Sequence, residues 1–184
     1  MRKLKLQMQI TVDGFVAGPK GQLAWMAPLD TDPAILAFIN QLTDSSDTIL
    51  LGRKMTEGFT AYWEGIPKGN PEYDFAQKMV GTPKIAFSKT VTSLKGKNLR
   101  VERGDLVTAV NALKKVPGKD LMVYGGAGFV SSLVEHDLID ELNFFVNPVA
   151  IGEGMRVFKG RKDVKLERSV AYDSGVVVNT YLRR

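Results

Sequence analysis

Residues 121–134 constrain the fold more than any other segment of this 184-residue chain. An apolar run stops at Gly125-Gly126-Ala127-Gly128, and a second apolar run starts at Phe129. This pattern predicts a strand that turns sharply into a helix, because glycine accepts a positive φ and lets a ligand approach the backbone. The first N–H groups of such a helix would suit an anion such as a phosphate. From this segment alone, a tight connection without a ligand is an equal alternative.

Composition excludes several kinds of site. The chain has no cysteine and a single histidine, His136, which excludes disulfides, cysteine nucleophiles and zinc sites built from Cys and His, so we expect no metal. The formal net charge of +5 favours an anionic partner, either a phosphorylated cofactor or nucleic acid. Nucleic acid is the weaker alternative, because the basic residues are dispersed and no recognition-helix or RNA-binding signature accompanies them.

The amino-terminal residues and the apolar runs bear on location. Apolar and polar residues alternate after Met1, so no signal-peptide core is present, and no apolar run reaches the length of a membrane span. We therefore expect a cytoplasmic protein with no membrane partner.

Alternating strand and helix patterns run through most of the sequence. Every even position from 4 to 12 is apolar, which predicts a strand with one buried face. Residues 13–30 lack periodicity and predict a long functional loop. Asp32-Pro33 predicts the N-cap and first position of a helix that runs to about Thr43.

The remaining segments extend this alternation. Further strands are predicted at 47–52, 83–88, 99–102 and 121–124, and further helices at 53–62, 70–81, 105–116 and after the glycine turn. Only strands follow, at 140–149, 164–173 and 176–182, with Ser174-Gly175 as a hairpin turn. The fold class is therefore α/β: one domain over residues 1–184, with a mostly parallel sheet flanked by helices and antiparallel strands at its carboxyl-terminal edge.

Three predicted strand ends carry groups suited to one dinucleotide. They are Gly52-Arg53-Lys54, Ser88-Lys89-Thr90 and the glycine turn at 125–128. Ligands of open α/β sheets collect at the carboxyl ends of strands. Backbone and hydroxyl donors with cations would hold a pyrophosphate and a ribose phosphate. The alternative is that these cations are merely solvated, as most surface Lys and Arg are, but their recurrence at three strand ends favours a binding site.

Several motifs together resemble a known superfamily. The run Thr11-Val12-Asp13-Gly14-Phe15-Val16-Ala17 with Trp25, the run Leu51-Gly52-Arg53-Lys54, and Tyr124-Gly125-Gly126 resemble the dihydrofolate reductase superfamily. The blocks at 138–142, 148–149 and 152–154 narrow this to the branch that resembles the reductase domain of riboflavin biosynthesis. The resemblance covers essentially the whole chain and implies a dihydrofolate-reductase-like fold.

The resemblance implies NADPH as the cofactor, a small-molecule substrate and a homodimer formed through the terminal strands. The matching positions form three groups: Gly52, Arg53, Lys54, Ser88 and Lys89 for the adenosine phosphate region, Gly125, Gly126, Ala127, Gly128 and Phe129 for the pyrophosphate, and the backbone of Ala17 for the nicotinamide carboxamide. The loop from Asp13 to Trp25 resembles a mobile active-site loop.

Hydride transfer needs positioning and exclusion of water more than a reactive nucleophile. Trp25 is a candidate wall of the catalytic pocket, and Asp13 and Glu57 are the candidate catalytic acids. The alternatives are that Trp25 is simple core and that Asp13 only holds a turn.

Departures from the family patterns narrow the range of possible substrates. Ile35 follows Pro33-Ala34 where folate reductases carry an acid, which disfavours dihydrofolate, although Asp30 and Asp32 are close in sequence. Trp25 is followed by Met26-Ala27-Pro28-Leu29-Asp30 rather than by the residues that hold a substrate phosphate in riboflavin-type reductases. Met55 also stands where relatives often have threonine, with Thr56 as a neighbouring hydroxyl.

The sequence thus predicts an NADPH-dependent reductase of a small heterocyclic or ribityl-type acceptor, resembling 5-amino-6-(5-phosphoribosylamino)uracil reductase. The alternatives are an NADPH-binding module without turnover and a dihydrofolate or pterin reductase.

Overall fold

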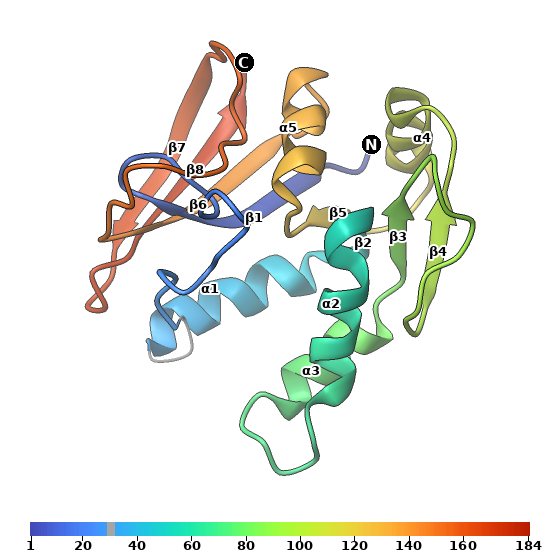
Figure 1. Cartoon of the computed structure of the whole chain (residues 1–184), viewed down its shortest axis with the longest axis horizontal. Coiled ribbons are helices and arrows are strands. Elements are labelled where there is room, and N and C mark those ends of the chain that lie inside the picture. The colour runs from blue at the N-terminus through green and yellow to red at the C-terminus, as the bar shows by residue number, and fades with distance from the viewer. Residues whose placement is uncertain (29–31) are drawn as a thin grey trace.

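Eight strands form one sheet in the computed structural model, which describes residues 1–28 and 32–184 (Figure 1). Their order is β4-β3-β2-β5-β1-β6-β8-β7. Their bounds are β1 Leu4–Thr11, β2 Ser46–Gly52, β3 Lys84–Phe87, β4 Leu99–Glu102, β5 Asp120–Val123, β6 Glu141–Asn147, β7 Val164–Ala171 and β8 Val177–Arg183. The pairs from β4 to β6 are parallel, whereas β8 is antiparallel to both β6 and β7. The predicted α/β class, mostly parallel with antiparallel carboxyl-terminal strands, is confirmed.

Five helices accompany the strands within the described residues. They are α1 Pro33–Asp44, α2 Arg53–Gly65, α3 Tyr73–Gly81, α4 Leu106–Lys115 and α5 Ala127–Glu135. The prediction ended α2 too early, and it began α3 too early because Asn70 forms a turn in which its carbonyl accepts from the Tyr73 N–H at 3.0 Å. Over the parts of the chain that the structure describes, no helix has the length and apolarity needed to cross a membrane.

The helices cover both faces of the sheet (Figure 1). On one face, Leu6 of β1 belongs to a buried cluster with Val110 of α4 and Val130 of α5. On the other face, Met122 of β5 packs with Ile39 of α1, and a neighbouring cluster joins β2 to α2 and α3. A central parallel strand in such a sheet is covered on both sides.

The buried face that the sequence predicts for β1 is formed by Leu4, Leu6 and Met8, but the opposite face is also partly covered. Gln7 and Gln9 are half-buried, on the side of the strand that faces α1. Lys5 lies on the same side, and its ammonium donates to the Ser45 hydroxyl at the end of α1 at 2.9 Å. The polar residues of β1 thus lie between the sheet and a helix rather than in solvent.

The start of α1 forms as the sequence predicts. The Asp32 carboxylate accepts hydrogen bonds from the N–H groups of Ala34 at 2.9 Å and Ile35 at 3.3 Å, and Pro33 opens the helix. This cap fixes the entry of α1 onto the sheet. Leu29, Asp30 and Thr31 lie outside the described residues.

We expect Asp32→Ala to lower the free energy of unfolding by about 1 kcal/mol, because two helix-start N–H groups lose their acceptor. Asp32→Asn keeps a capping oxygen and should lose much less. Urea denaturation followed by circular dichroism measures both variants. An equal loss in the two would show that Asp32 does not act as a cap.

Candidate functional site

The three predicted strand ends lie next to one another in the structure. β2 is the middle strand of β3, β2 and β5, and the three are parallel, so their carboxyl ends share one edge of the sheet. Gly52 ends β2, Ser88 follows β3, and Gly125 follows β5 after one residue. The helix starts of α2 and α5 lie at this same edge.

The starts of α2 and α5 are in direct contact. A Cβ placed on Gly52 would lie 2.6 Å from the Cβ of Phe129, and a Cβ on Gly126 would lie 3.6 Å from the Cα of Gly52. Gly126 also has a φ of +73°, which disfavours a side chain. The ring of Phe129 stacks on Phe87 at 5.2 Å between centroids. Glycine is therefore required where the two helices begin.

Neither of these two helix starts has a side-chain cap. Gly52 and Gly126 are their N-cap residues, and no acidic residue lies in the first turn of either helix. By contrast, α1 and α4 are capped by the carboxylates of Asp32 and Asp105. Two sets of N–H groups, each at the positive end of a helix dipole, thus meet at one place. Such a place is suited to an anion.

Three cations lie at this edge of the sheet. Arg53 and Lys54 are exposed in the first turn of α2, and Lys89 is exposed beyond β3. Lys89 is also close enough to Asp105 to contribute to the lowered pKa of that carboxyl, whose largest cause is the hydrogen bond from the Thr108 N–H. These side chains can reach an anion without breaking a buried contact.

Two hydroxyls near this edge are already used within the protein. Ser88 is buried, and its Oγ accepts from the N–H groups of Thr90 at 3.1 Å and Val91 at 3.2 Å, which closes a turn. Thr56 is fully buried and donates to the Gly52 carbonyl at 3.1 Å, so it is not the free hydroxyl that the sequence suggested. A ligand role for Ser88 stays a prediction.

The predicted active-site loop is fastened through Asp13. Its carboxylate accepts from the Thr11 hydroxyl at 2.5 Å and from the N–H groups of Ile151 at 3.1 Å and Gly152 at 2.8 Å. The Thr11 hydrogen bond, with smaller contributions from Gly152 and Ile151, holds the pKa of Asp13 below its ordinary value. Asp13 is thus an ionised loop anchor, and its catalytic role stays a prediction.

Ala17 lies on the same loop and joins the same segment. The Met155 N–H donates to the Ala17 carbonyl at 2.8 Å, and the Val16 N–H donates to the Met155 carbonyl at 2.9 Å. A Cβ on Gly154 would lie 2.2 Å from the Ala17 oxygen, so this close approach requires glycine. The carbonyl of Ala17 is occupied, which leaves its N–H as the backbone group for an amide ligand.

The segment that carries Trp25 is docked on β6 and β1. The Ala27 N–H donates to Asn147 Oδ1 at 2.8 Å, and Asn147 Nδ2 donates to Gln9 Oε1 at 3.0 Å. Trp25 is half-buried, and its Nε1 is one of the buried polar atoms without a partner among the described residues, as is Oε1 of Gln7. One buried donor and one buried acceptor are thus without a partner among the described residues.

Sequence reasoning missed Gln7, Gln9 and Asn147. Their position in the sequence could have revealed them, because polar residues are unusual on a central parallel strand that is covered on both faces.

Glu57, the second candidate acid, is exposed on α2, and its carboxylate accepts from the Lys95 N–H at 3.3 Å. Glu57 therefore contacts the segment after β3, and among the described residues it has no hydrogen bond to Trp25 or Asp13.

Lowering the pH should release the loop from residues 151–152. The folded-state pKa of Asp13 is depressed, so its contribution is complete above the ordinary carboxyl pKa of about 3.9 and is lost as the pH falls through the folded value. Amide hydrogen-exchange protection of Gly152 should fall in that acid range. Asp13→Ala should show low protection at neutral pH as well, because the N–H groups of Ile151 and Gly152 lose their acceptor. Full protection in Asp13→Ala would contradict the anchoring role.

Gly52→Ala should destabilise the protein by about 1 to 3 kcal/mol, because its Cβ overlaps Phe129 and pushes the two helix starts apart. Gly58→Ala is the matched control on α2, since a Cβ there meets nothing within 4 Å and should stabilise the helix by up to about 1 kcal/mol. Thermal and urea unfolding compare them. Equal stability of Gly52→Ala and the wild type would contradict the close contact.

The chain belongs to the RibD C-terminal domain family, whose family model matches residues 2–178. It is similar to protein YyaP of Bacillus subtilis (strain 168), with 32% identity over 186 residues that cover 98% of this chain and 94% of YyaP. The resemblance to the riboflavin-biosynthesis branch that the motifs predict is therefore confirmed.

Two solved structures show the same fold. A provisionally named riboflavin biosynthesis protein from Shewanella sp. PV-4 has a TM-score of 0.74 at 20% identity, covering 100% of this chain and 99% of that chain. Dihydrofolate reductase from Enterococcus faecalis, solved with NADP(H), has a TM-score of 0.65 at 18% identity, covering 99% of this chain and 96% of that chain. The predicted dihydrofolate-reductase-like architecture is confirmed.

Proposed function

We propose that this protein is an NADPH-dependent reductase of a small heterocyclic acceptor, with 5-amino-6-(5-phosphoribosylamino)uracil as the first candidate. Family membership supports a reductase of the riboflavin-pathway type. The observation that carries the cofactor assignment is the contact between two uncapped helix starts at Gly52 and Gly126. A dinucleotide brings several negative charges to such a place, and its pyrophosphate fits the helix-start N–H groups.

The residues present fit NADPH. The first turn of α5, residues 127–129, would hold the pyrophosphate, because Gly125 and Gly126 leave the backbone accessible. Arg53 and Lys54 would hold the adenosine ribose phosphate, since both are exposed beside the helix start. The NADP(H) bound by the Enterococcus faecalis enzyme of the same fold supports this assignment.

The loop would position the reacting ring and exclude water. NADPH supplies a hydride when bound. The Ala17 N–H would hold the carboxamide, and the pairing of Ala17 with Met155 keeps that N–H in place. Asp13 fastens the same loop to Gly152, so the loop enters the site in a defined geometry.

The substrate that accepts the hydride would be recognised by amide and indole groups. The unpaired Oε1 of Gln7 and the unpaired Nε1–H of Trp25 offer one acceptor and one donor, which suits a heterocycle with both kinds of edge. Ile35 cannot protonate a pterin, and the Asp32 carboxylate is occupied by the start of α1. These observations favour a pyrimidine over dihydrofolate.

Titration of NADPH, followed by its fluorescence, tests the cofactor assignment. The double variant Arg53→Gln and Lys54→Gln should bind NADPH at least about tenfold more weakly and lose any preference over NADH, because a phosphate contact is worth roughly 1.5 kcal/mol or more. Lys68→Gln is the control, since Lys68 is an exposed lysine in the connection between α2 and α3. Unchanged NADPH affinity in the double variant would contradict the proposed cofactor site.

NADPH oxidation with two acceptors separates the reductase from its alternatives. Oxidation of NADPH in the presence of 5-amino-6-(5-phosphoribosylamino)uracil, but not of dihydrofolate, supports the proposal. Consumption with dihydrofolate alone would make the protein a pterin reductase. Tight NADPH binding without oxidation by either acceptor would make it a binding module.

The homodimer expected from the resemblance stays a proposal supported by the edge of the sheet. β7 is the last strand of the sheet, and most of its residues are exposed, including Leu166. An exposed edge strand can pair with another chain. Sedimentation equilibrium measures whether two copies associate.

A further inference from the structure

The connection between β3 and β4, residues 88–98, is attached to α2 through its backbone. The Lys95 N–H donates to Glu57 Oε1 at 3.3 Å, and the Lys97 N–H donates to Glu64 Oε1 at 2.6 Å. Both carboxylates belong to exposed side chains of α2. The attachment therefore uses the main chain of the connection and leaves its side chains for other contacts.

A third residue of α2 holds the same stretch. The Thr60 hydroxyl donates to the Lys95 carbonyl at 3.0 Å. A Cβ on Gly96 would lie 2.6 Å from Cγ2 of Thr60, so glycine allows the backbone to come this close to the helix. Positions 57, 60 and 64 are three and four residues apart, and they share one face of α2. One helix face thus fixes the last part of the connection.

The first part of the connection carries Lys89. Ser88 Oγ accepts from the N–H groups of Thr90 at 3.1 Å and Val91 at 3.2 Å, which closes a turn directly after β3. The chain that leaves this turn runs to the stretch that α2 holds. Lys89 therefore lies in a turn that is fixed by β3 on one side and by α2 on the other.

This turn lies beside the start of α2. Gly52 pairs with Phe87 in the parallel ladder of β2 and β3, so the residues that follow each of them begin about one strand spacing apart, roughly 5 Å. Arg53 and Lys54 follow Gly52, and Lys89 comes two residues after Phe87. The adenosine ribose phosphate of the proposed cofactor would lie among these three cations.

Glu57 is spaced along α2 so that it could neutralise two of these cations. It comes four residues after Arg53 and three after Lys54, at which spacing oppositely charged side chains pair on a helix. Its carboxylate instead accepts from the Lys95 N–H, and neither cation has an ion pair among the described residues. The attached connection thus holds the carboxylate and leaves both cations for a phosphate.

Lys89 has a competing partner on the other side of the turn. The pKa of Asp105, the cap of α4, is lowered mainly by the hydrogen bond from the Thr108 N–H, and the charge of Lys89 adds to this effect. Lys89 therefore lies between the carboxylate of α4 and the cations of α2. The course of the connection decides which of the two it serves.

We propose that the face of α2 formed by Glu57, Thr60 and Glu64 positions the connection, and through it Lys89, for the selection of NADPH over NADH. The attachment keeps Lys89 beside the cations of α2, where the ribose phosphate would lie. This role rests on the proposed NADPH site. Glu57 then acts in cofactor recognition, as a positioning residue, rather than in proton transfer.

Calorimetric titration with adenosine 2′,5′-bisphosphate and with 5′-AMP tests this role, because only the bisphosphate carries the group that distinguishes NADPH from NADH. Glu57→Ala and Glu57→Gln both remove the charge, but only glutamine keeps an acceptor for the Lys95 N–H. Glu57→Ala should bind the bisphosphate about fivefold more weakly than Glu57→Gln, as expected for one lost hydrogen bond, and the two should bind 5′-AMP equally. Glu64→Ala and Glu64→Gln should differ in the same way.

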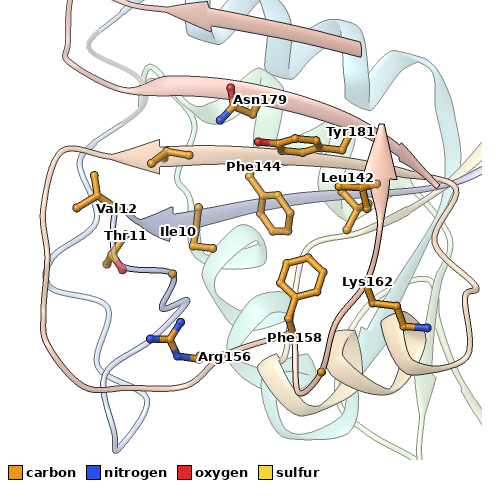
Figure 2. A pocket seen from close by; sticks show the side chains of 14 residues that line it. Ile10, Thr11, Val12, Leu142, Phe144, Arg156, Phe158, Lys162, Asn179 and Tyr181 are labelled. Atoms are coloured by element: carbon orange, nitrogen blue, oxygen red, sulfur yellow. The ribbon is translucent and has the colours of Figure 1, made fainter. Parts of the chain in front are cut away.

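A double-mutant cycle shows whether the effect passes through Lys89. In a Lys89→Gln background, the difference between Glu57→Ala and Glu57→Gln should disappear. Arg156→Gln is the control for the loss of a cation without an ion pair among the described residues. Arg156 stacks over the Phe15 ring at 4.0 Å and lines a hollow that no residue of α2 or of the connection lines (Figure 2). Its loss should leave both affinities unchanged.

The positioning role is overturned if Glu57→Ala and Glu57→Gln bind the bisphosphate equally, if they differ as much in 5′-AMP binding, or if the difference persists in the Lys89→Gln background. Because Glu57 is exposed, both variants should be folded, which thermal unfolding verifies. A wild-type protein without preference for the bisphosphate over 5′-AMP would contradict the proposed cofactor as well. If the wild type shows this preference and the two Glu57 variants are equal, only the positioning role fails.

Discussion

The contact between the starts of α2 and α5 is the constraint on which the candidate cofactor site depends. Gly52 and Gly126 bring two positive helix ends together, and Arg53 and Lys54 add charge of the same sign. Without an anion this arrangement is electrostatically unfavourable, because like ends of dipoles repel. Capping carboxylates would have relieved it, as they do in α1 and α4, and here they are missing. The cost in the free protein is explained if a polyanionic ligand binds there.

Most elements could be predicted from local pattern. The alternation in β1, the Asp32-Pro33 start of α1 and the glycine turn before α5 depend on residues close in sequence, and each forms as predicted. Parallel topology places the three strand ends at one edge of the sheet, whereas their adjacency depends on the order β3-β2-β5, which local pattern does not give. The environment of Gln7 could not be predicted in this way, because it depends on α1 crossing the other face of β1. Alternation shows two faces but does not show what covers them.

The segment between β6 and β7 was the least predictable part of the chain. Residues 150–163 have no helical or strand period, yet Ile151, Gly152 and Met155 bind the loop through Asp13 and Ala17. These contacts join positions more than 130 residues apart in sequence. Asp13 illustrates the limit: its residue type suggested an acid, and nothing in the sequence indicated the three hydrogen bonds by which it anchors the loop. Only the folded chain reveals which partners a carboxylate has.

Two buried polar atoms without a partner among the described residues, Gln7 Oε1 and Trp25 Nε1, belong to the part of the molecule where the proposed acceptor would bind. A buried acceptor without a partner costs about 1 to 3 kcal/mol, and Gln7 Oε1 bears that cost in the free protein. An aliphatic residue on a central strand would avoid it and pack as well. Local rules are broken in this way mainly at functional sites. Gln7 and Trp25 each leave one group unpaired, of opposite hydrogen-bonding character, whereas Gln9 and Asn147 satisfy each other and hold the Trp25 segment in place. The paired amides therefore hold the Trp25 segment on the sheet, and the recognition proposed for the acceptor would depend on the unpaired groups.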